Sequence, residues 1–64
     1  MKIGDFGLCE FILRPKRGEK IWFLIYVTVI ETDDGNVLLR DNEDFFYLVR
    51  KKDIKMFETK TNKI

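Results

Sequence analysis

Histidine is absent from this chain of 64 residues, and cysteine and proline occur only once each. With Cys9 alone, the sequence offers neither an internal disulfide nor the Cys/His ligand set of a zinc site, and Cys9 is expected as a small buried hydrophobic residue. The four glycines are scattered and form no phosphate-binding loop. The central acidic residues lie in expected turns, where nothing predicts a buried catalytic acid. We therefore expect a protein that is not an enzyme and that uses no metal, cofactor or small-molecule substrate.

A long hydrophobic run is missing as well. The longest stretch without a charge covers residues 21–30, whereas a membrane-spanning helix needs about 20 apolar residues. Asp5 and Glu10 interrupt the apolar residues near the N-terminus, which argues against a secretory signal. Together with the single cysteine, these absences predict a cytoplasmic protein in a reducing environment, with no membrane partner.

What the sequence does contain is one strongly apolar strand. Residues 21–30 are rich in β-branched and aromatic side chains, which favours a strand over a helix. Both alternating faces of this strand are apolar, because Trp22, Leu24 and Tyr26 occupy even positions between apolar odd ones. A small sheet with one face in water would instead alternate apolar and polar residues. We therefore expect something to cover the second face.

Turn residues divide the rest of the chain into short segments. Proline and glycine mark a loop at 14–20, an Asp-Gly pair marks a hairpin turn at 32–36, and an acidic run marks a further turn at 41–44. The expected strands cover residues 5–13, 21–31, 37–40, 45–50 and 54–58. This pattern predicts an all-β fold, a five-stranded antiparallel barrel or roll with a short 3-10 turn at 51–53 before the last strand. We expect a single domain over residues 1–58 and a polar tail at 59–64.

Several short segments occur in an order known from small barrels. They are Gly4-Asp5, the long strand from Trp22, the Asp34-Gly35 hairpin, and Tyr47-Leu48-Val49 followed by Lys52-Asp53-Ile54. Over residues 4–58 the arrangement resembles the SH3-like barrels, the group that includes Tudor, chromo-barrel and KOW-type domains. The acidic first loop and Ala-Leu-Tyr-like strand of proline-binding SH3 domains are absent, as is the glycine-rich core of a KOW motif. The resemblance therefore implies a fold and leaves the function open.

Strand alternation sorts the side chains into an inner and an outer set. If the odd positions of 21–30 face the core, the later strands direct Val37, Leu39, Phe45, Tyr47 and Val49 inward. The outer set is then Trp22, Leu24, Tyr26, Leu38, Phe46 and Leu48, on three adjacent strands. Such a continuous patch exceeds what a monomer usually exposes, and Trp and Tyr are typical of binding hot spots. We predict a protein-binding module acting as a homodimer, a subunit of a larger assembly or a small inhibitor, and the short chain suits an accessory or phage-type adaptor.

The outer set has an alternative explanation, in which the chain covers these residues itself. A bulge in the long strand would reverse which side chains point inward beyond it. A terminal segment could also fold over the outer face. The candidate covering residues are Phe6, Leu8 and Ile12 near the N-terminus, and Met56, Phe57 and Ile64 near the C-terminus.

Two basic blocks support a different class of function, nucleic-acid binding through the loops at 14–20 and 50–55. The candidate phosphate contacts are Arg14, Lys16, Arg17, Lys20, Arg50, Lys51 and Lys52. In a simple meander, however, the basic loop 14–20 would lie at the same end as the acidic turn 41–44, and the acidic turn 32–36 beside the corner 50–53. Opposite charges at both ends would then cancel much of the positive field that a nucleic acid requires.

Overall fold

The computed structural model describes residues 1–60 and contains one five-stranded sheet. Its elements are β1 (Phe6–Leu13), β2 (Ile21–Thr32), β3 (Asn36–Asp41), β4 (Phe46–Arg50), the 3-10 turn η1 (Lys51–Asp53) and β5 (Ile54–Thr59). Neighbouring strands are antiparallel in the order β4-β3-β2-β1-β5. The predicted fold class is confirmed for the described part of the chain, including the 3-10 turn before the last strand. Thr59, predicted to begin the tail, ends β5 instead, and 61–64 lie outside the described residues.

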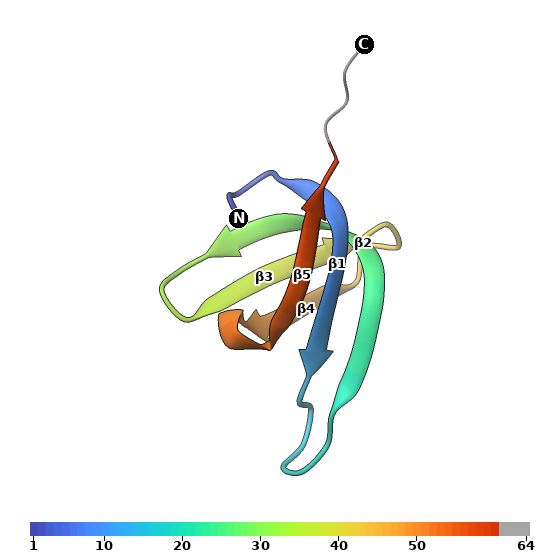
Figure 1. The fold of residues 1–64 in the computed structure, drawn as a ribbon, viewed down its shortest axis with the longest axis vertical. Coiled ribbons are helices and arrows are strands. Elements are labelled where there is room, and N and C mark those ends of the chain that lie inside the picture. The colour runs from blue at the N-terminus through green and yellow to red at the C-terminus, as the bar shows by residue number, and fades with distance from the viewer. Residues whose placement is uncertain (61–64) are drawn as a thin grey trace.

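β2 is long enough to take part in two ladders. Residues 21–28 pair with β1, residues 27–32 pair with β3, and only Val27 and Thr28 belong to both. Figure 1 shows the consequence: β2 first runs alongside β1 and β5, then curves to run with β3 and β4, which cross the first group at a steep angle. The two groups of strands are therefore joined through the middle of β2.

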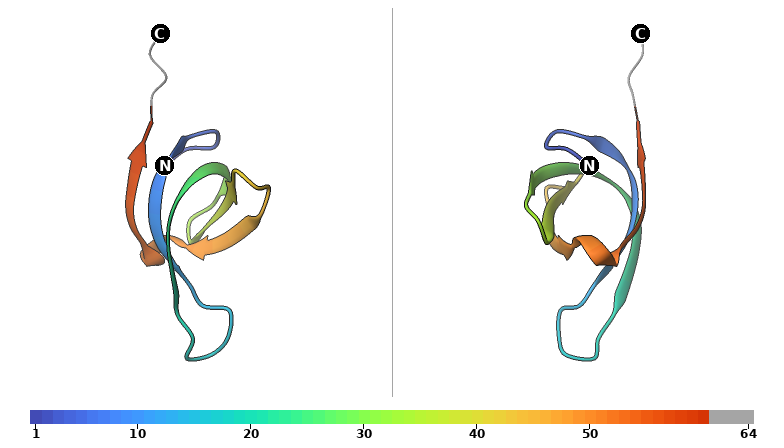
Figure 2. Two further views of the ribbon diagram at one scale, coloured as in Figure 1. Left: turned by 90° about the vertical axis from the view of Figure 1, so that its right-hand side faces the viewer. Right: turned by 60° about the vertical axis from the view of Figure 1, so that its left-hand side comes forward.

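The sheet curls until its two ends approach each other, as the two views in Figure 2 show. The ring of Phe11 in β1 lies 5.6 Å from that of Tyr47 in β4, and the ring of Phe23 in β2 lies 5.1 Å from each of them. The fully buried side chains enclosed by the curl are Cys9, Phe11, Val27, Val29, Val37, Leu39 and Val49. The predicted inner positions of β2 and β3 are thus largely confirmed, because these side chains line the concave side, but Ile21 at the start of β2 is 45% exposed.

A bulge that exchanges the inward and outward directions of the side chains does occur in β2, but only late in the strand. The β2–β3 register shifts between Val29 and Glu31, so Ile30 is the extra residue. Beyond it, Glu31 is exposed and Thr32 is half-buried, which reverses the earlier alternation. Trp22 and the other even residues of the first part of β2 precede the bulge and stay on the convex side.

The alternation predicts Phe45 inside the core, and this prediction is wrong, since the side chain is 61% exposed. Phe45 precedes β4 and belongs to a turn that the Asp41 carboxylate organises. One carboxylate oxygen accepts the backbone N–H groups of Glu43 and Phe45 at 2.8 and 3.0 Å. Asp44 adopts a positive φ of 66°, which reverses the chain direction. The alternation of inward and outward side chains in this strand therefore begins only at Phe46.

Candidate protein-binding surface

Two large apolar side chains lie exposed near the start of β2. Trp22 and Leu24 are 58% and 59% exposed, and Tyr26, which follows them on the same face, is less so. The register places Ile12 of β1 beside Trp22 and Leu8 beside Tyr26. Ile12 is only 5% exposed, so we refer to the other four side chains, Leu8, Trp22, Leu24 and Tyr26, as the β1–β2 outer face. They are held by a continuous antiparallel ladder, so the surface is rigid as well as apolar.

The terminal segments cover only one corner of this face. The ring of Phe6 stacks on Tyr26 with 5.7 Å between centroids, and the Lys60 Nζ lies 5.2 Å from the centre of the Tyr26 ring. Phe57 packs against the inner core instead of the outer face. Leu8 is a strand neighbour of Tyr26 and extends the face sideways without shielding Trp22 or Leu24, whereas Ile12 is buried beside Trp22. Ile64, the last predicted covering residue, lies outside the described residues.

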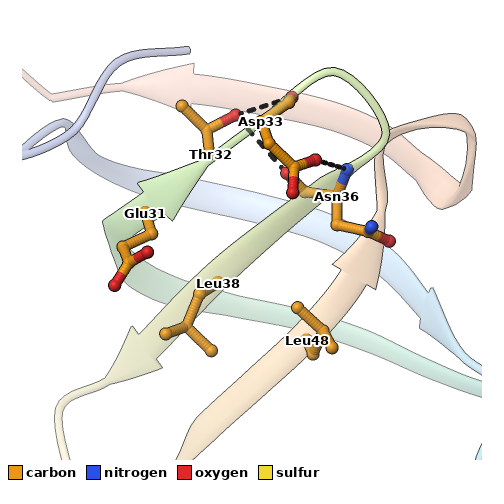
Figure 3. Close-up of a pocket in the computed structure, with 6 residues that line it drawn as sticks. All are labelled: Glu31, Thr32, Asp33, Asn36, Leu38 and Leu48. Carbon is orange, nitrogen blue, oxygen red and sulfur yellow. Dashed lines mark hydrogen bonds between the residues drawn. The ribbon is translucent and has the colours of Figure 1, made fainter.

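The other three predicted contact residues form a separate group on β3 and β4. Leu38 pairs with Leu48, and Phe46 pairs with Arg40; Phe46 and Leu48 are well exposed. Figure 3 shows Leu38 and Leu48 side by side, bordering a hollow that is also lined by Glu31, Thr32, Asp33 and Asn36.

The six predicted residues therefore do not form one patch across three adjacent strands. The β3 ladder begins only at Val27, so β3 and β4 never run beside Trp22 or Leu24. The sharp bend of β2 then directs the two groups along different parts of the convex surface (Figure 1). Sequence alternation identified the outer residues but could not show this division.

One edge of the first part of β2 is left without a partner strand. In an antiparallel ladder, successive residues direct their N–H and C=O groups to opposite sides. The Val29 N–H donates to the Asp5 carbonyl oxygen at 2.8 Å, on the β1 side, so the odd residues of β2 bond towards β1 and the even ones point away from it. Because the β3 ladder begins at Val27, no described strand lies beside Trp22 or Leu24 on the side away from β1. We call the edge along residues 21–25 the free edge of β2.

The two predicted basic blocks meet through a partly buried ion pair. The Nε and Nη2 groups of Arg14 donate to the two carboxylate oxygens of Asp53 at 3.0 and 3.1 Å. Asp53 is only 4% exposed, and the hydrogen bonds from Arg14 lower the pKa of its carboxyl group, with nearby Lys52 and Arg50 adding to the effect. The pair fixes the base of loop 14–20 to η1, while Lys16, Arg17 and Lys20 stay exposed farther along the loop.

The corner at η1 lies against the acidic hairpin turn, as predicted. The Lys51 N–H donates to the Gly35 carbonyl oxygen at 3.0 Å. The Asp33 carboxylate accepts the N–H groups of Gly35 and Asn36 at 2.8 and 2.7 Å. These two hydrogen bonds, and to a smaller extent the charge of Lys51, lower the pKa of Asp33. Arg50, Lys51 and Lys52 therefore share their surface with carboxylates.

The predicted proximity of loop 14–20 and the acidic turn 41–44 is wrong. The turn lies beside the middle of β2, where Asp41, Asn42 and Glu43 line a hollow together with Leu24 and Tyr26. Loop 14–20 extends beyond the start of β2, away from this turn (Figures 1 and 2). A simple meander assumes strands of equal length, whereas β2 has 12 residues and β3 has 6. The free edge of β2 therefore has a basic end and an acidic end.

Chemistry at the remaining groups is limited. Burial raises the pKa of the Cys9 thiol to about 11, which suppresses the reactive thiolate. Within residues 1–60 there is no cluster of three or more His, Cys, Asp or Glu side chains able to hold a metal ion. In the same part of the chain, no helix has the length and apolar character needed to cross a membrane.

Comparison of the chain with protein-family models, with curated proteins and with solved structures finds no match.

Sequence reasoning missed two features of this surface. It treated Leu8 as a cover, although Leu8 lies next to β2 and enlarges the outer face. It also missed the free edge. The signal for that edge was the difference in length between the long apolar run and the short third strand, because the excess residues of β2 cannot be paired by β3.

Proposed function

We propose that this protein is a non-enzymatic protein-binding module whose contact surface is the β1–β2 outer face. The observation that carries the proposal is the adjacent exposure of Trp22 and Leu24 on a rigid ladder. Burying such side chains against a partner removes a large apolar area from water, and Trp is enriched among residues that dominate binding energies. The strand order and η1 support the resemblance to SH3-like barrels, a fold that hosts many binding functions. We expect a cytoplasmic location, in keeping with the buried thiol of Cys9.

Nucleic-acid binding is the competing proposal, and one observation favours it. The contact between Arg14 and Asp53 brings the base of loop 14–20 next to η1, so the two basic blocks adjoin. The carboxylates of Asp53 and Asp33 lie within this basic region, however, and lower its net positive charge. If the loops contact phosphates, neutralising Lys16 and Arg17 to Gln will weaken binding of labelled single-stranded DNA or RNA and will reduce the salt slope by about 1 per lost contact.

Photo-crosslinking tests the preferred proposal directly. A photoreactive phenylalanine analogue replaces Trp22 in one variant and Lys55, an exposed residue of β5, in the matched control. Each variant is expressed in the cells that produce the protein, and the adducts are identified by mass spectrometry. We expect protein adducts from position 22 and none from position 55. A folded position-22 variant that yields no protein adduct, or only nucleic-acid adducts, would refute the proposed function.

A further inference from the structure

We infer that the partner on this surface is a second copy of the same chain, paired antiparallel along the free edge of β2 about a two-fold axis. This inference rests on the proposed function and names its partner. The pairing would join the two sheets into one continuous sheet. It would bring Trp22 of one copy close to Leu24 of the other on the outer side, and it would satisfy the N–H and C=O groups that both residues direct away from β1.

The free edge lacks the features that normally prevent strand pairing. Natural edge strands are protected by charged residues, proline, bulges or short length. Residues 21–26 of β2 contain no charge and no proline, and the bulge at Ile30 comes later. The outer edge of the sheet at β5 differs, since it carries Lys55 and Glu58 and is half as long as β2. An unprotected apolar edge fits a strand that pairs with another chain.

Charge complementarity identifies that chain as a second copy. Loop 14–20, with Lys16, Arg17 and Lys20, adjoins the start of the free edge, and the acidic turn with Glu43 adjoins its other end. An antiparallel two-fold pairing places the basic end of each copy against the acidic end of the other, so both ends of the interface are attractive. Within residues 1–60, the Glu43 carboxylate forms no ion pair or hydrogen bond that would compete with this contact.

A charge exchange tests the two-fold geometry. Sedimentation equilibrium measures self-association of the wild type, of Lys20→Glu and of Glu43→Lys over a wide range of concentration. Each single variant turns both end contacts repulsive in its own homodimer, so we expect self-association roughly tenfold weaker than in the wild type. An equimolar mixture of the two variants restores both attractive contacts and should dimerise as well as the wild type. Failure of the mixture to recover would overturn the antiparallel arrangement.

Two matched leucine variants locate the interface. Leu24→Lys adds a charge beside the free edge and should leave the protein monomeric, whereas Leu48→Lys, at a somewhat more exposed site on β4, should leave the dimer intact. Circular dichroism confirms that both variants fold. The reverse pattern, or a wild type that stays monomeric at every concentration, would overturn the second copy as partner. If a monomeric wild type still yields crosslinks to a different protein from position 22, the proposed function stands and only this inference fails.

Discussion

The two parts of β2 have different surroundings. Residues 27–32 pair with β3, Val27 and Thr28 pair with β1 as well, and Val27 and Val29 are buried. Residues 21–26 pair with β1 alone, and Trp22 and Leu24 stay exposed on their outer side. The comparison teaches that an apolar strand can serve the core over one part of its length and offer a contact surface over the other. The length of the neighbouring strands determines which part is buried in the core and which part stays exposed.

The largest expected difference between the two regions concerns leucine truncation. Leu39 is fully buried against the second part of β2, so Leu39→Ala should lower the free energy of unfolding by about 2–5 kcal/mol. Leu24→Ala, on the exposed first part, should change it by about 0.5 kcal/mol or less in the monomer. Urea denaturation at low protein concentration measures both values. Equal losses would mean that Leu24 belongs to the core.

Proline substitution separates the two parts through their backbones. The Thr28 N–H points towards Arg40 of β3, whereas the Leu24 N–H points to the free edge. Thr28→Pro leaves an acceptor in the ladder unpaired and should destabilise the fold by about 1–3 kcal/mol more than Leu24→Pro does. Thermal unfolding of the two variants side by side checks the difference. A Leu24→Pro variant as unstable as Thr28→Pro would show that the edge is not free.

The ion pair at the base of loop 14–20 gives the protein part of its acid sensitivity. The pKa of Asp53 is lowered in the folded state, mainly by the hydrogen bonds from Arg14. Its contribution to stability is therefore fully present above the unfolded pKa of about 3.9 and is lost as the pH falls through the lower folded pKa. Asp53→Asn should reduce stability at neutral pH and flatten the acid limb of the stability curve. Unfolding midpoints in urea at several pH values provide the test; an unchanged acid limb would contradict the assignment.

The smallest expected effect appears at high pH, near the second part of β2. The Tyr47 hydroxyl donates to the Asp41 carboxylate at 2.6 Å, and this bond raises the pKa of Tyr47 to about 12. The stability it contributes is present below pH 10 and is lost as the pH rises through 12. Absorbance at 295 nm in a Tyr26→Phe background follows the ionisation of Tyr47 alone. Asp41→Asn should shift the transition towards the ordinary value of about 10, and a transition already near 10 in the parent would refute the bond.

Much of the fold could be predicted because alternation and turn residues are local signals. Apart from Ile21, the even and odd positions of β2 before the bulge, and those of β3, were sorted correctly from the period of two, and the Asp34-Gly35 pair marked the hairpin. The place of the bulge at Ile30 could not be predicted, since any residue of a uniformly apolar strand could be the extra one. The register between β2 and β3 could not be predicted either, and for this reason the division of the predicted surface into two groups was missed.

Some contacts could not be predicted from the sequence. Arg14 and Asp53 are 39 positions apart, and were assigned to a loop and to the 3-10 turn, yet they form the partly buried ion pair. The alternation predicted Phe45 in the core, but Phe45 lies in the turn that Asp41 closes. In the first case a side chain from a distant segment decides the outcome, and in the second the Asp41 carboxylate four residues earlier does.

Hydrogen exchange of single amides by NMR, at low and high protein concentration, tests the central claim most directly. At low concentration, the N–H groups of Trp22 and Leu24 should exchange quickly, while those of Phe23 and Ile25, which bond to β1, should be protected. At high concentration, protection should appear at Trp22 and Leu24, because a second copy then occupies the free edge. Exchange at these two amides that stays equally fast at every concentration would contradict the account.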